Sequence, residues 1–374
     1  MIRYGLIGAG MMGQEHIRNI ALLGGATVTA VADPNETMRL AAMTTAHAQG
    51  FERADDLLAS GLCDALLIAA PNDLHAGLLR QAMATDLPIL VEKPLATTSA
   101  DCRALMAEAE GRRAPVWVAM EYRYMPPMQR LMALLDEGVA GAPRMVSIRE
   151  HRFPFLRKVD DWNRFSARTG GTLVEKCCHF WDLMRLLLRA DPVRVYASGG
   201  GGTNHADERY DRGVPDIIDH AYVVVDFENG TRGMLDLCMF GEGSYWQEQV
   251  AVTGPAGRVE AFVPGPARFA PDGQPREAEI VTALRATREE RREVVHTPPE
   301  LLIAGDHHGS TFYQHRRFVD LVRTGRGAPE VSMADGYWSV LVGEAAEESA
   351  RTGLAVDLRG RGPFAAAARE ARAG

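Results

Sequence analysis

Three closely spaced glycines near the N-terminus restrict the fold of this chain more than any other feature. The apolar run Ile2–Ile7 has the composition of a buried strand, and Gly8-Ala9-Gly10-Met11-Met12-Gly13 follows it directly and opens a helical pattern. In such a unit the first glycine permits a tight turn, the second lets a ligand approach the backbone, and the third allows close helix packing. The free N–H groups of the helix N-terminus then favour an anion such as a diphosphate.

An acidic residue completes this motif. Asp33 lies 20 residues beyond Gly13, at the end of the apolar run Thr27–Ala32. A carboxylate at that spacing accepts hydrogen bonds from the ribose hydroxyls of a bound dinucleotide. Pro34 and Asn35 follow it, so no basic residue is placed to hold a 2′-phosphate. We therefore predict a site for NAD, with NADP less favoured, whose cofactor-binding residues include Gly8, Gly10, Met11, Met12, Gly13 and Asp33.

The rest of the chain divides into two patterns. Residues 1–122 alternate short apolar runs with amphipathic stretches, which predicts a Rossmann domain built on a doubly wound parallel sheet. In residues 123–357 a hairpin pattern surrounds Glu228-Asn229-Gly230, and helical periodicity covers 173–189, 311–323 and 333–351. This second pattern predicts an α+β domain on a mostly antiparallel open sheet. Residues 358–374, rich in Ala, Arg and Gly, are expected to form a loose C-terminal tail.

Composition excludes several classes of protein. The chain has 374 residues, with 46% hydrophobic and 24% charged side chains, which suits two packed domains. A net charge of −8 gives no general attraction for nucleic acid, and no apolar run is long enough to predict a membrane span. The N-terminus lacks the pattern of a secretion signal, and the five cysteines lack framework spacing. We expect reduced thiols in a cytoplasmic protein.

Two polar segments follow predicted strands at the edge where open α/β sheets bind ligands. One contains Pro71, Asn72 and His75, and the other is Glu92-Lys93-Pro94. At that edge the Lys93 ammonium would face the nicotinamide and favour the partly anionic form of an alcohol or carbonyl oxygen. His75 either contacts the nicotinamide ribose or is a hydrogen-bonded histidine inside a helix, and the sequence leaves both interpretations open.

Taken together, these motifs resemble one oxidoreductase family. GAGMMG, Asp33, PNDLH (71–75), EKP (92–94), GGTLVEKCCHFWDL (170–183) and DGYWSVLVGEAAEES (335–349) occur in the order and spacing typical of the glucose–fructose oxidoreductase / inositol dehydrogenase / MocA family. The resemblance implies an N-terminal Rossmann domain, a C-terminal α/β domain whose open sheet forms homodimers or homotetramers, and hydride transfer to or from a sugar or cyclitol.

The resemblance also implies a catalytic set. The family's lysine corresponds to Lys93 and its histidine to His179, whereas the usual aspartate four residues before the histidine is replaced here by Glu175. The helical pattern agrees, because at 100° per residue a continuous helix would place Glu175, His179 and Asp182 on one stripe opposite an apolar face. We expect His179 to take a hydroxyl proton, Lys93 to stabilise the alkoxide, and Glu175 to orient His179 or bind a second hydroxyl.

A basic segment follows the Rossmann pattern. Residues 144–168 carry seven basic side chains against three acidic ones, in a chain of net charge −8. Either this segment is a solvated strand and loop or a subunit contact, or some of its cations bind an anionic group of the substrate. The candidate substrate-binding residues are Tyr122, Arg123, Arg152, Arg157, Trp162, Arg164 and Asp182.

Three classes of function remain open at this point. The first is an NAD-dependent dehydrogenase or reductase of a sugar, cyclitol or sugar acid. The second is a glycosidase that oxidises, eliminates and reduces an anionic glycoside with a recycled cofactor, as the resemblance allows. The third is a non-enzymatic nucleotide sensor, against which the pair Lys93 and His179 argues. Since Cys-x-x-Cys and His-x-x-x-His patterns are absent, no metal centre is predicted.

Overall fold

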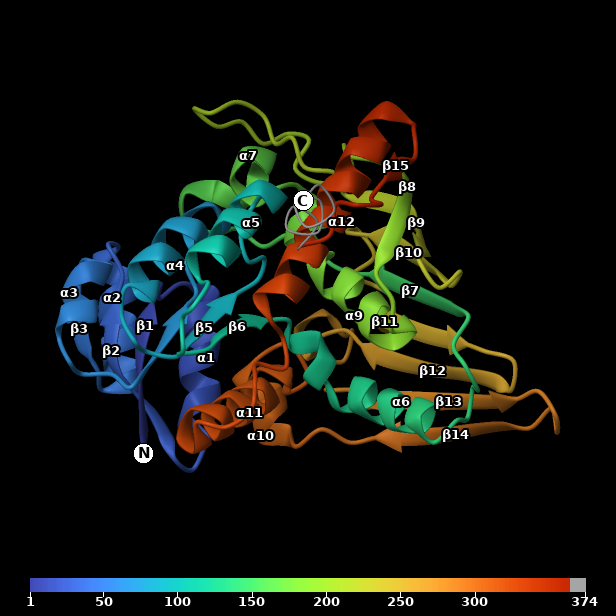
Figure 1. Cartoon of the computed structure of the whole chain (residues 1–374), viewed down its shortest axis with the longest axis horizontal. Coiled ribbons are helices and arrows are strands. Elements are labelled where there is room, and N and C mark those ends of the chain that lie inside the picture. The colour runs from blue at the N-terminus through green and yellow to red at the C-terminus, as the bar shows by residue number, and fades with distance from the viewer. Residues whose placement is uncertain (364–374) are drawn as a thin grey trace, which may run out of the picture.

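The computed structural model describes residues 1–363 and contains two sheets whose helices pack against one another (Figure 1). The first sheet has six parallel strands in the order β3-β2-β1-β4-β5-β6. Its strands are β1 (Ile2–Ile7), β2 (Ala26–Ala32), β3 (Gln49–Phe51), β4 (Ala65–Ile68), β5 (Ile89–Glu92) and β6 (Val116–Ala119). The helices between them are α1 (Met11–Ala21), α2 (Glu36–Ala46), α3 (Ala54–Ala59), η1 (Asn72–Leu74), α4 (His75–Met83) and α5 (Ser99–Glu108).

The strands β4, β5 and β6 are buried along their whole length, as expected for a parallel sheet covered on both faces. Two helices from the C-terminal half complete this cover. They are α11 (Ser310–Thr324), which packs against α1, and α12 (Met333–Thr352), which packs against α5 and β6. The C-terminal half therefore contributes directly to the packing of the N-terminal sheet.

The second sheet has nine strands in the order β14-β13-β12-β11-β7-β10-β9-β8-β15. All its neighbours are antiparallel except β7 and β10. Its strands are β7 (Met145–His151), β8 (Pro192–Gly200), β9 (His220–Phe227), β10 (Arg232–Cys238), β11 (Trp246–Thr253), β12 (Gly257–Pro264), β13 (Ala278–Leu284), β14 (Glu290–Val295) and β15 (Val356–Asp357). This confirms the predicted fold class.

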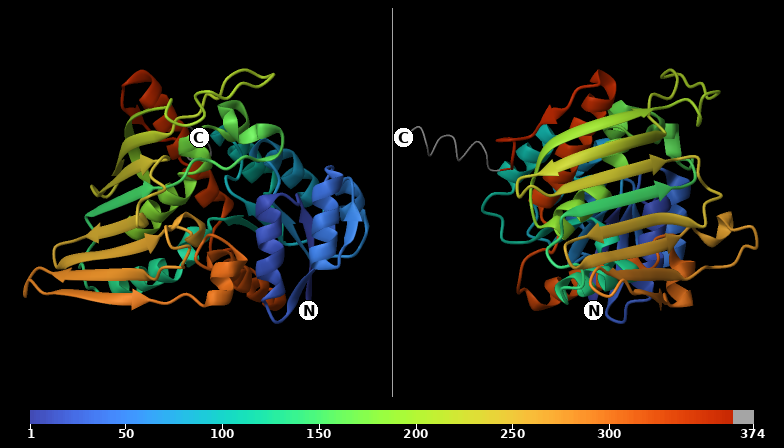
Figure 2. Two further views of the ribbon diagram at one scale, coloured as in Figure 1. Left: turned by 180° about the vertical axis from the view of Figure 1, so that it is seen from behind. Right: turned by 90° about the vertical axis from the view of Figure 1, so that its right-hand side faces the viewer.

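One face of the second sheet carries the helices α6 (Pro126–Asp136), α9 (Cys178–Leu188) and α12, whereas the other face is seen free of helices in Figure 2. Residues of β9 alternate between buried and exposed, which is the pattern of a sheet covered on one side. The remaining short elements are η2 (Glu121–Tyr124), η3 (Val159–Arg164), α7 (Ser166–Thr169), α8 (Thr172–Glu175), η4 (Ala267–Phe269) and α10 (Pro299–Ala304).

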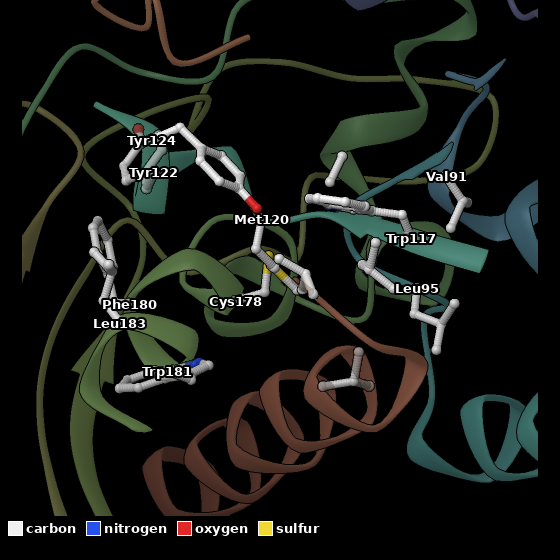
Figure 3. Packing of buried hydrophobic residues seen from close by; sticks show 14 of the residues in the cluster. Val91, Leu95, Trp117, Met120, Tyr122, Tyr124, Cys178, Phe180, Trp181 and Leu183 are labelled. Atoms are coloured by element: carbon white, nitrogen blue, oxygen red, sulfur yellow. The ribbon is translucent and has the colours of Figure 1, made fainter. Parts of the chain in front are cut away.

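The two halves share one apolar core. In Figure 3, Val91 and Trp117 lie on one side of Met120 and Cys178, and Phe180 of α9 lies on the other side. This shared core fixes α9 relative to the carboxyl ends of β5 and β6. Ligand-binding residues from the two halves are thereby held at the same place.

The sequence predicted one helix over 173–189, and this prediction is wrong in one respect. The helix is divided at Lys176 and Cys177 into α8 and α9. Two carbonyls that would continue the helical ladder accept side-chain donors instead: Leu173 O accepts Trp181 Nε1 at 2.8 Å, and Glu175 O accepts Lys93 Nζ at 3.1 Å. The simple 100° stripe therefore does not extend across this segment.

The chain also remains packed beyond residue 357. Leu358 is buried, and its N–H donates to Val193 O at 2.9 Å. The beginning of the expected loose tail is thus part of the second half, because it presents an apolar side chain to the core. The rest of that tail, residues 364–374, lies outside the described residues.

Candidate active site

A cavity of about 750 Å³ lies between the carboxyl ends of the first sheet and residues 157–168 of the second half. Most of the residues predicted to bind the cofactor line it: Gly8, Gly10, Met11, Met12, Asp33, Pro71, Asn72, Glu92 and Lys93. Gly13 and His75 are not among the lining residues. The cavity is therefore enclosed by both halves of the chain.

A side chain is excluded at each glycine of the N-terminal motif for a different reason. Gly8 has φ +97°, and a Cβ there would lie 2.6 Å from Ala69 O. A Cβ on Gly13 would lie 2.3 Å from Gly8 O, so this residue is needed for helix packing behind the cavity. A Cβ on Gly10 would meet no protein atom within 4 Å, although Gly10 lines the cavity. Gly10 thus leaves room for a ligand, as a dinucleotide cradle requires.

The polar groups of the cavity also fit NAD. Asp33 Oδ2 accepts from Ala9 N at 2.7 Å and Oδ1 accepts from Asn35 N at 2.8 Å, which fixes the carboxylate at the end of β2. The N-terminus of α1 has no side-chain cap, so its N–H groups remain available to an anion. Asn72 Nδ2 is buried without a hydrogen-bond partner among the described residues. These groups would hold the cofactor's ribose, diphosphate and nicotinamide end.

His75 is a hydrogen-bonded histidine inside the protein, which is the second of the two interpretations left open by the sequence. Its Nδ1 lies 2.7 Å from Pro94 O and its Nε2 lies 2.9 Å from Ala70 O. The ring is fully buried, and burial lowers its pKa although these two contacts oppose the shift. His75 therefore connects the two strand-end segments instead of facing the cavity.

Lys93 reaches across from the first sheet to the second half. Its Nζ donates to the carbonyl of Glu175, and its backbone N–H donates to Glu92 Oε2 at 3.1 Å. Glu92 Oε1 lies 2.9 Å from His16 Nε2, which ties this segment to α1. Burial opposes the charge of Lys93, but the Cys178 thiol and the carboxylates of Glu175 and Glu92 outweigh it and raise the pKa of Lys93. The ammonium is therefore stable at neutral pH.

Glu175 and His179 each present a buried polar atom that lacks a hydrogen-bond partner within the described chain, Oε2 and Nδ1 respectively. The His179 ring stacks on Tyr122 at 4.0 Å with an interplanar angle of 9°. Only 2% of His179 is exposed, and burial together with the positive charges of Lys93 and Lys176 holds its pKa well below its usual range. The imidazole is neutral and has acceptor capacity for a hydroxyl group.

Arg123 and Asp182 lie elsewhere than the sequence predicted. Asp182 is 1% exposed and accepts two hydrogen bonds from the Arg123 guanidinium, which also donates to Glu330 O at 2.8 Å. Neither residue lines the cavity. The division between α8 and α9 separates Glu175 from the helix that carries both His179 and Asp182. Asp182 is bound by Arg123, so this pair connects α9 to η2 inside the protein.

Of the candidate substrate-binding residues in the basic segment, only two line the cavity. Arg157 and Trp162 line the cavity, and Arg157 pairs with Asp161 at 2.8 Å. Arg164 is buried against Glu208 at 2.7 Å, and Arg152 lies 3.7 Å from the buried Glu150. Arg164 and Arg152 do not line the cavity.

Sequence reasoning missed Lys158 as a site residue. Lys158 lines the cavity, its Nζ lies 3.3 Å from Glu175 Oε1, and it lies over the Trp162 ring at 4.4 Å from the centroid. A signal for it existed in the sequence. Of the 41 lysines and arginines only three are lysines, Lys93, Lys158 and Lys176, and the fold brings all three to this region.

Beside the site is a second cluster of titratable groups. Its members Glu15, Glu121 and His307 offer ligand atoms within 4.8 Å of one another. His307 Nδ1 lies 2.7 Å from Glu15 Oε1 and 3.5 Å from Glu121 Oε1. Burial opposes the imidazolium, but Glu121 and Glu15 outweigh it and raise the pKa of His307 to about 10. Within the described residues this cluster is therefore an internal ion-pair network.

The fold and the cavity define a NAD-binding oxidoreductase with a Rossmann half and an α/β half. The sequence model of "Oxidoreductase family, NAD-binding Rossmann fold" matches residues 2–120, and that of the family's C-terminal alpha/beta domain matches residues 132–358. The chain thus belongs to the glucose–fructose oxidoreductase / inositol dehydrogenase / MocA family, and its cofactor is NAD. It is an enzyme of the dehydrogenase type that acts on CH–OH groups.

Individual relatives agree with this assignment. The chain is 30% identical over 366 residues to an inositol 2-dehydrogenase of Pseudomonas fluorescens, covering 96% of both chains. It is 29% identical over 289 residues to the rhizopine catabolism protein MocA of Rhizobium meliloti, covering 77% of this chain and 84% of that protein. Levoglucosan dehydrogenase in complex with NADH has the same fold, with a TM-score of 0.79, 21% identity and coverage of 95% of this chain and 98% of that one.

Proposed function

We propose that this enzyme transfers a hydride between NAD and a secondary alcohol or carbonyl of a sugar, cyclitol or sugar acid. One observation carries the proposal: Glu175 Oε2 and His179 Nδ1 are buried without partners among the described residues, and they lie behind Lys93, which lines the cofactor cavity although Glu175 and His179 themselves do not. Buried polar atoms without partners are costly unless a ligand completes them. A polyol offers adjacent hydroxyl groups that would satisfy both atoms at once.

The roles of the residues follow from their charge states. Lys93, held as an ammonium, donates to the substrate oxygen and stabilises the alkoxide that forms when its proton leaves. Neutral His179 takes up the proton of the reacting hydroxyl at Nδ1, and the stacked Tyr122 ring holds the imidazole in place. Glu175 Oε2 binds a second hydroxyl of the substrate. Bound NAD would supply the hydride acceptor for oxidation, and bound NADH the hydride donor for carbonyl reduction.

The names of the relatives support a cyclitol or sugar as substrate. One is an inositol 2-dehydrogenase, and one similar structure was determined with levoglucosan. An anionic sugar is a more specific proposal for the substrate. Arg157 is exposed at the cavity and pairs with the carboxylate of Asp161, which an anionic group of the substrate would replace.

We also place the enzyme in the cytoplasm, since all five cysteines are unbridged. None of the described helices is long and apolar enough to cross a membrane.

A substrate screen tests the proposal. Polyols, cyclitols, sugars, sugar acids and acidic aryl glycosides are each incubated with NAD, and NADH and released aglycone are measured together. A dehydrogenase accumulates NADH. A cofactor-recycling glycosidase releases aglycone without accumulating NADH, and a sensor does neither. We expect Lys93→Met to lower kcat/KM by about 100-fold or more, since it removes the donor to the developing alkoxide. Full activity of this variant would refute the mechanism.

We propose that the chain forms the two domains that the sequence indicates, residues 1–122 and 123–357. We also propose that it forms a homodimer or homotetramer through the second sheet. The free face of that sheet carries Tyr222, which is 64% exposed, beside the exposed Tyr196, Val224 and Met234. The strand register places Val224 opposite both Tyr196 and Met234, so these apolar side chains form one continuous row. Such a row on an open sheet is typical of a subunit interface.

A further inference from the structure

A segment of the second half lies across the cofactor cavity. Residues 157–168, here called the strap, contribute six of the residues that line this cavity. The cradle residues Gly10 and Asp33 line the same cavity from the first half. A dinucleotide held in the cradle would therefore lie directly against the strap.

The strap is tied to the second half by contacts of its own. The Arg164 guanidinium, whose side chain is 3% exposed, pairs with Glu208 at 2.7 Å. Ser166, the first residue of α7, donates to the Asp216 carboxylate from its N–H at 2.6 Å and from its hydroxyl at 2.7 Å. These contacts fix the strap within the second half, but they do not hold it to the first half.

One ion pair joins the strap to the first half. Arg168 Nε donates to Asp73 Oδ2 at 2.8 Å and Arg168 Nη2 donates to Asp73 Oδ1 at 3.3 Å, so both carboxylate oxygens are bound. Within residues 1–363, the strap makes no other hydrogen bond or ion pair with residues 1–122. Arg168 belongs to α7 and Asp73 to η1, and Figure 1 shows α7 reaching from the second half towards α4.

The two partners differ in their relation to the cavity. Arg168 lines it, whereas Asp73 does not, although its neighbours Asn72 and Leu74 do. Asp73 therefore faces Arg168 and not the ligand. The side chains of Arg168 and Asp73 are 18% and 27% exposed, so water reaches the pair. Because water can replace such a contact, this pair can open more readily than an ion pair in the core.

The first-half side of the contact is the more rigid one. His75 directly follows η1, and its ring nitrogens contact Pro94 O at 2.7 Å and Ala70 O at 2.9 Å. The strap, in contrast, turns at Asp160 and Asp161 with φ of +53° and +48°, which residues other than glycine adopt at a cost in free energy. Opening of the ion pair should therefore move the strap and leave η1 in place.

We propose that the Arg168–Asp73 pair is a latch that holds the strap over NAD and sets the rate at which the cofactor enters and leaves. When the pair opens, the strap separates from η1 and the cofactor passes between them. Both partners belong to the protein, so the latch forms without the cofactor and must open for entry as well as for exit. The inference concerns the exchange of the cofactor and does not depend on the identity of the substrate.

Stopped-flow measurements of NADH binding test the latch, with energy transfer from tryptophan to NADH as the signal. The association rate constant comes from the dependence on NADH concentration, and the dissociation rate constant comes from displacement by excess NAD. Asp73→Asn keeps the shape of the side chain but removes its charge. We expect both rate constants to rise by about threefold to tenfold and the dissociation constant to change by less than about twofold.

Two results of this experiment would contradict the latch. A rise in the dissociation rate constant alone would show that the pair stabilises only the bound state. Unchanged rate constants would show that the pair does not limit exchange. Either result would overturn the inference.

Arg168→Gln separates the latch from a direct attraction between the guanidinium and the cofactor. NADH is an anion, so loss of a positive charge that only attracts it would lower the association rate constant. The latch predicts the opposite, a rise of about threefold to tenfold, because the strap is released. Adding Asp73→Asn to Arg168→Gln should then change this constant by less than about twofold. A fall in Arg168→Gln, or a further large rise in the double variant, would refute the latch.

Glu108→Gln is the matched control. Glu108 pairs with Arg80 at 2.8 Å between α5 and α4, and neither residue lines the cavity. Because this pair lies within the first half, its loss should leave both rate constants within about twofold of the parent. An increase equal to that of Asp73→Asn would show that any weakened ion pair of the first half speeds exchange, and the specific role of Arg168 and Asp73 would be lost.

Discussion

The buried pair of Arg123 and Asp182 gives the sharpest test of the structure, because the sequence assigned both residues to the substrate. Asp182→Asn keeps the shape of the side chain but leaves the Arg123 guanidinium buried without its main counter-charge. Removing one partner of a buried ion pair costs about 3–5 kcal/mol of unfolding free energy. Asp335, 3.8 Å from Arg123, compensates in part, so we expect a loss near the lower end, about 3 kcal/mol.

Urea denaturation followed by far-ultraviolet circular dichroism measures this loss. Asp226→Asn is the matched control, since Asp226 pairs with Arg194, whose side chain is 57% exposed, and should lose less than about 1 kcal/mol. The double variant Arg123→Met with Asp182→Leu should regain much of the loss, because it removes both charges together. A stability within about 1 kcal/mol of the parent, combined with a severalfold increase in KM, would instead place Asp182 at the substrate and refute our reasoning.

Two further predictions concern the cofactor cradle and the free sheet face. Gly10→Ala should leave stability within about 1 kcal/mol of the parent but weaken NADH binding about tenfold, measured by fluorescence, because its methyl group enters the cavity. Gly13→Ala should instead lose about 1–3 kcal/mol of stability, since its Cβ meets Gly8 O. Tyr222→Lys together with Val224→Glu should yield monomers in sedimentation velocity; an unchanged oligomer would exclude this face as the interface.

Local sequence patterns were sufficient for the cofactor and for the first sheet except its short edge strand β3, which no apolar run marks. The glycine motif is a contiguous strand–turn–helix unit, and the steric demands on Gly8, Gly10 and Gly13 are met within it or by the neighbouring strand. The buried strands β4, β5 and β6 appear as apolar runs because both faces of a parallel sheet are covered. These features depend on residues close in the chain, so periodicity and spacing reveal them.

The catalytic centre required the tertiary structure. Helical periodicity placed Glu175, His179 and Asp182 on one stripe, but the helix divides between Glu175 and His179, where the distant Lys93 donates to the Glu175 carbonyl. Arg123, also distant in the chain, pairs with Asp182 inside the protein. The same holds for Lys158, whose neighbours Glu175 and Lys93 lie 17 and 65 residues away along the chain. Its place at the cavity was signalled in the sequence only by the scarcity of lysine.

The sequence by itself determined that this protein binds NAD on a Rossmann fold and that a lysine, a glutamate and a histidine are its candidate catalytic residues. Only the tertiary structure decided that Lys158 faces the cavity, whereas Arg123 and Arg164 pair with carboxylates inside the protein. The physical reason is that composition fixes the number of charges, whereas the free energy of each charge depends on its burial and on partners from distant segments.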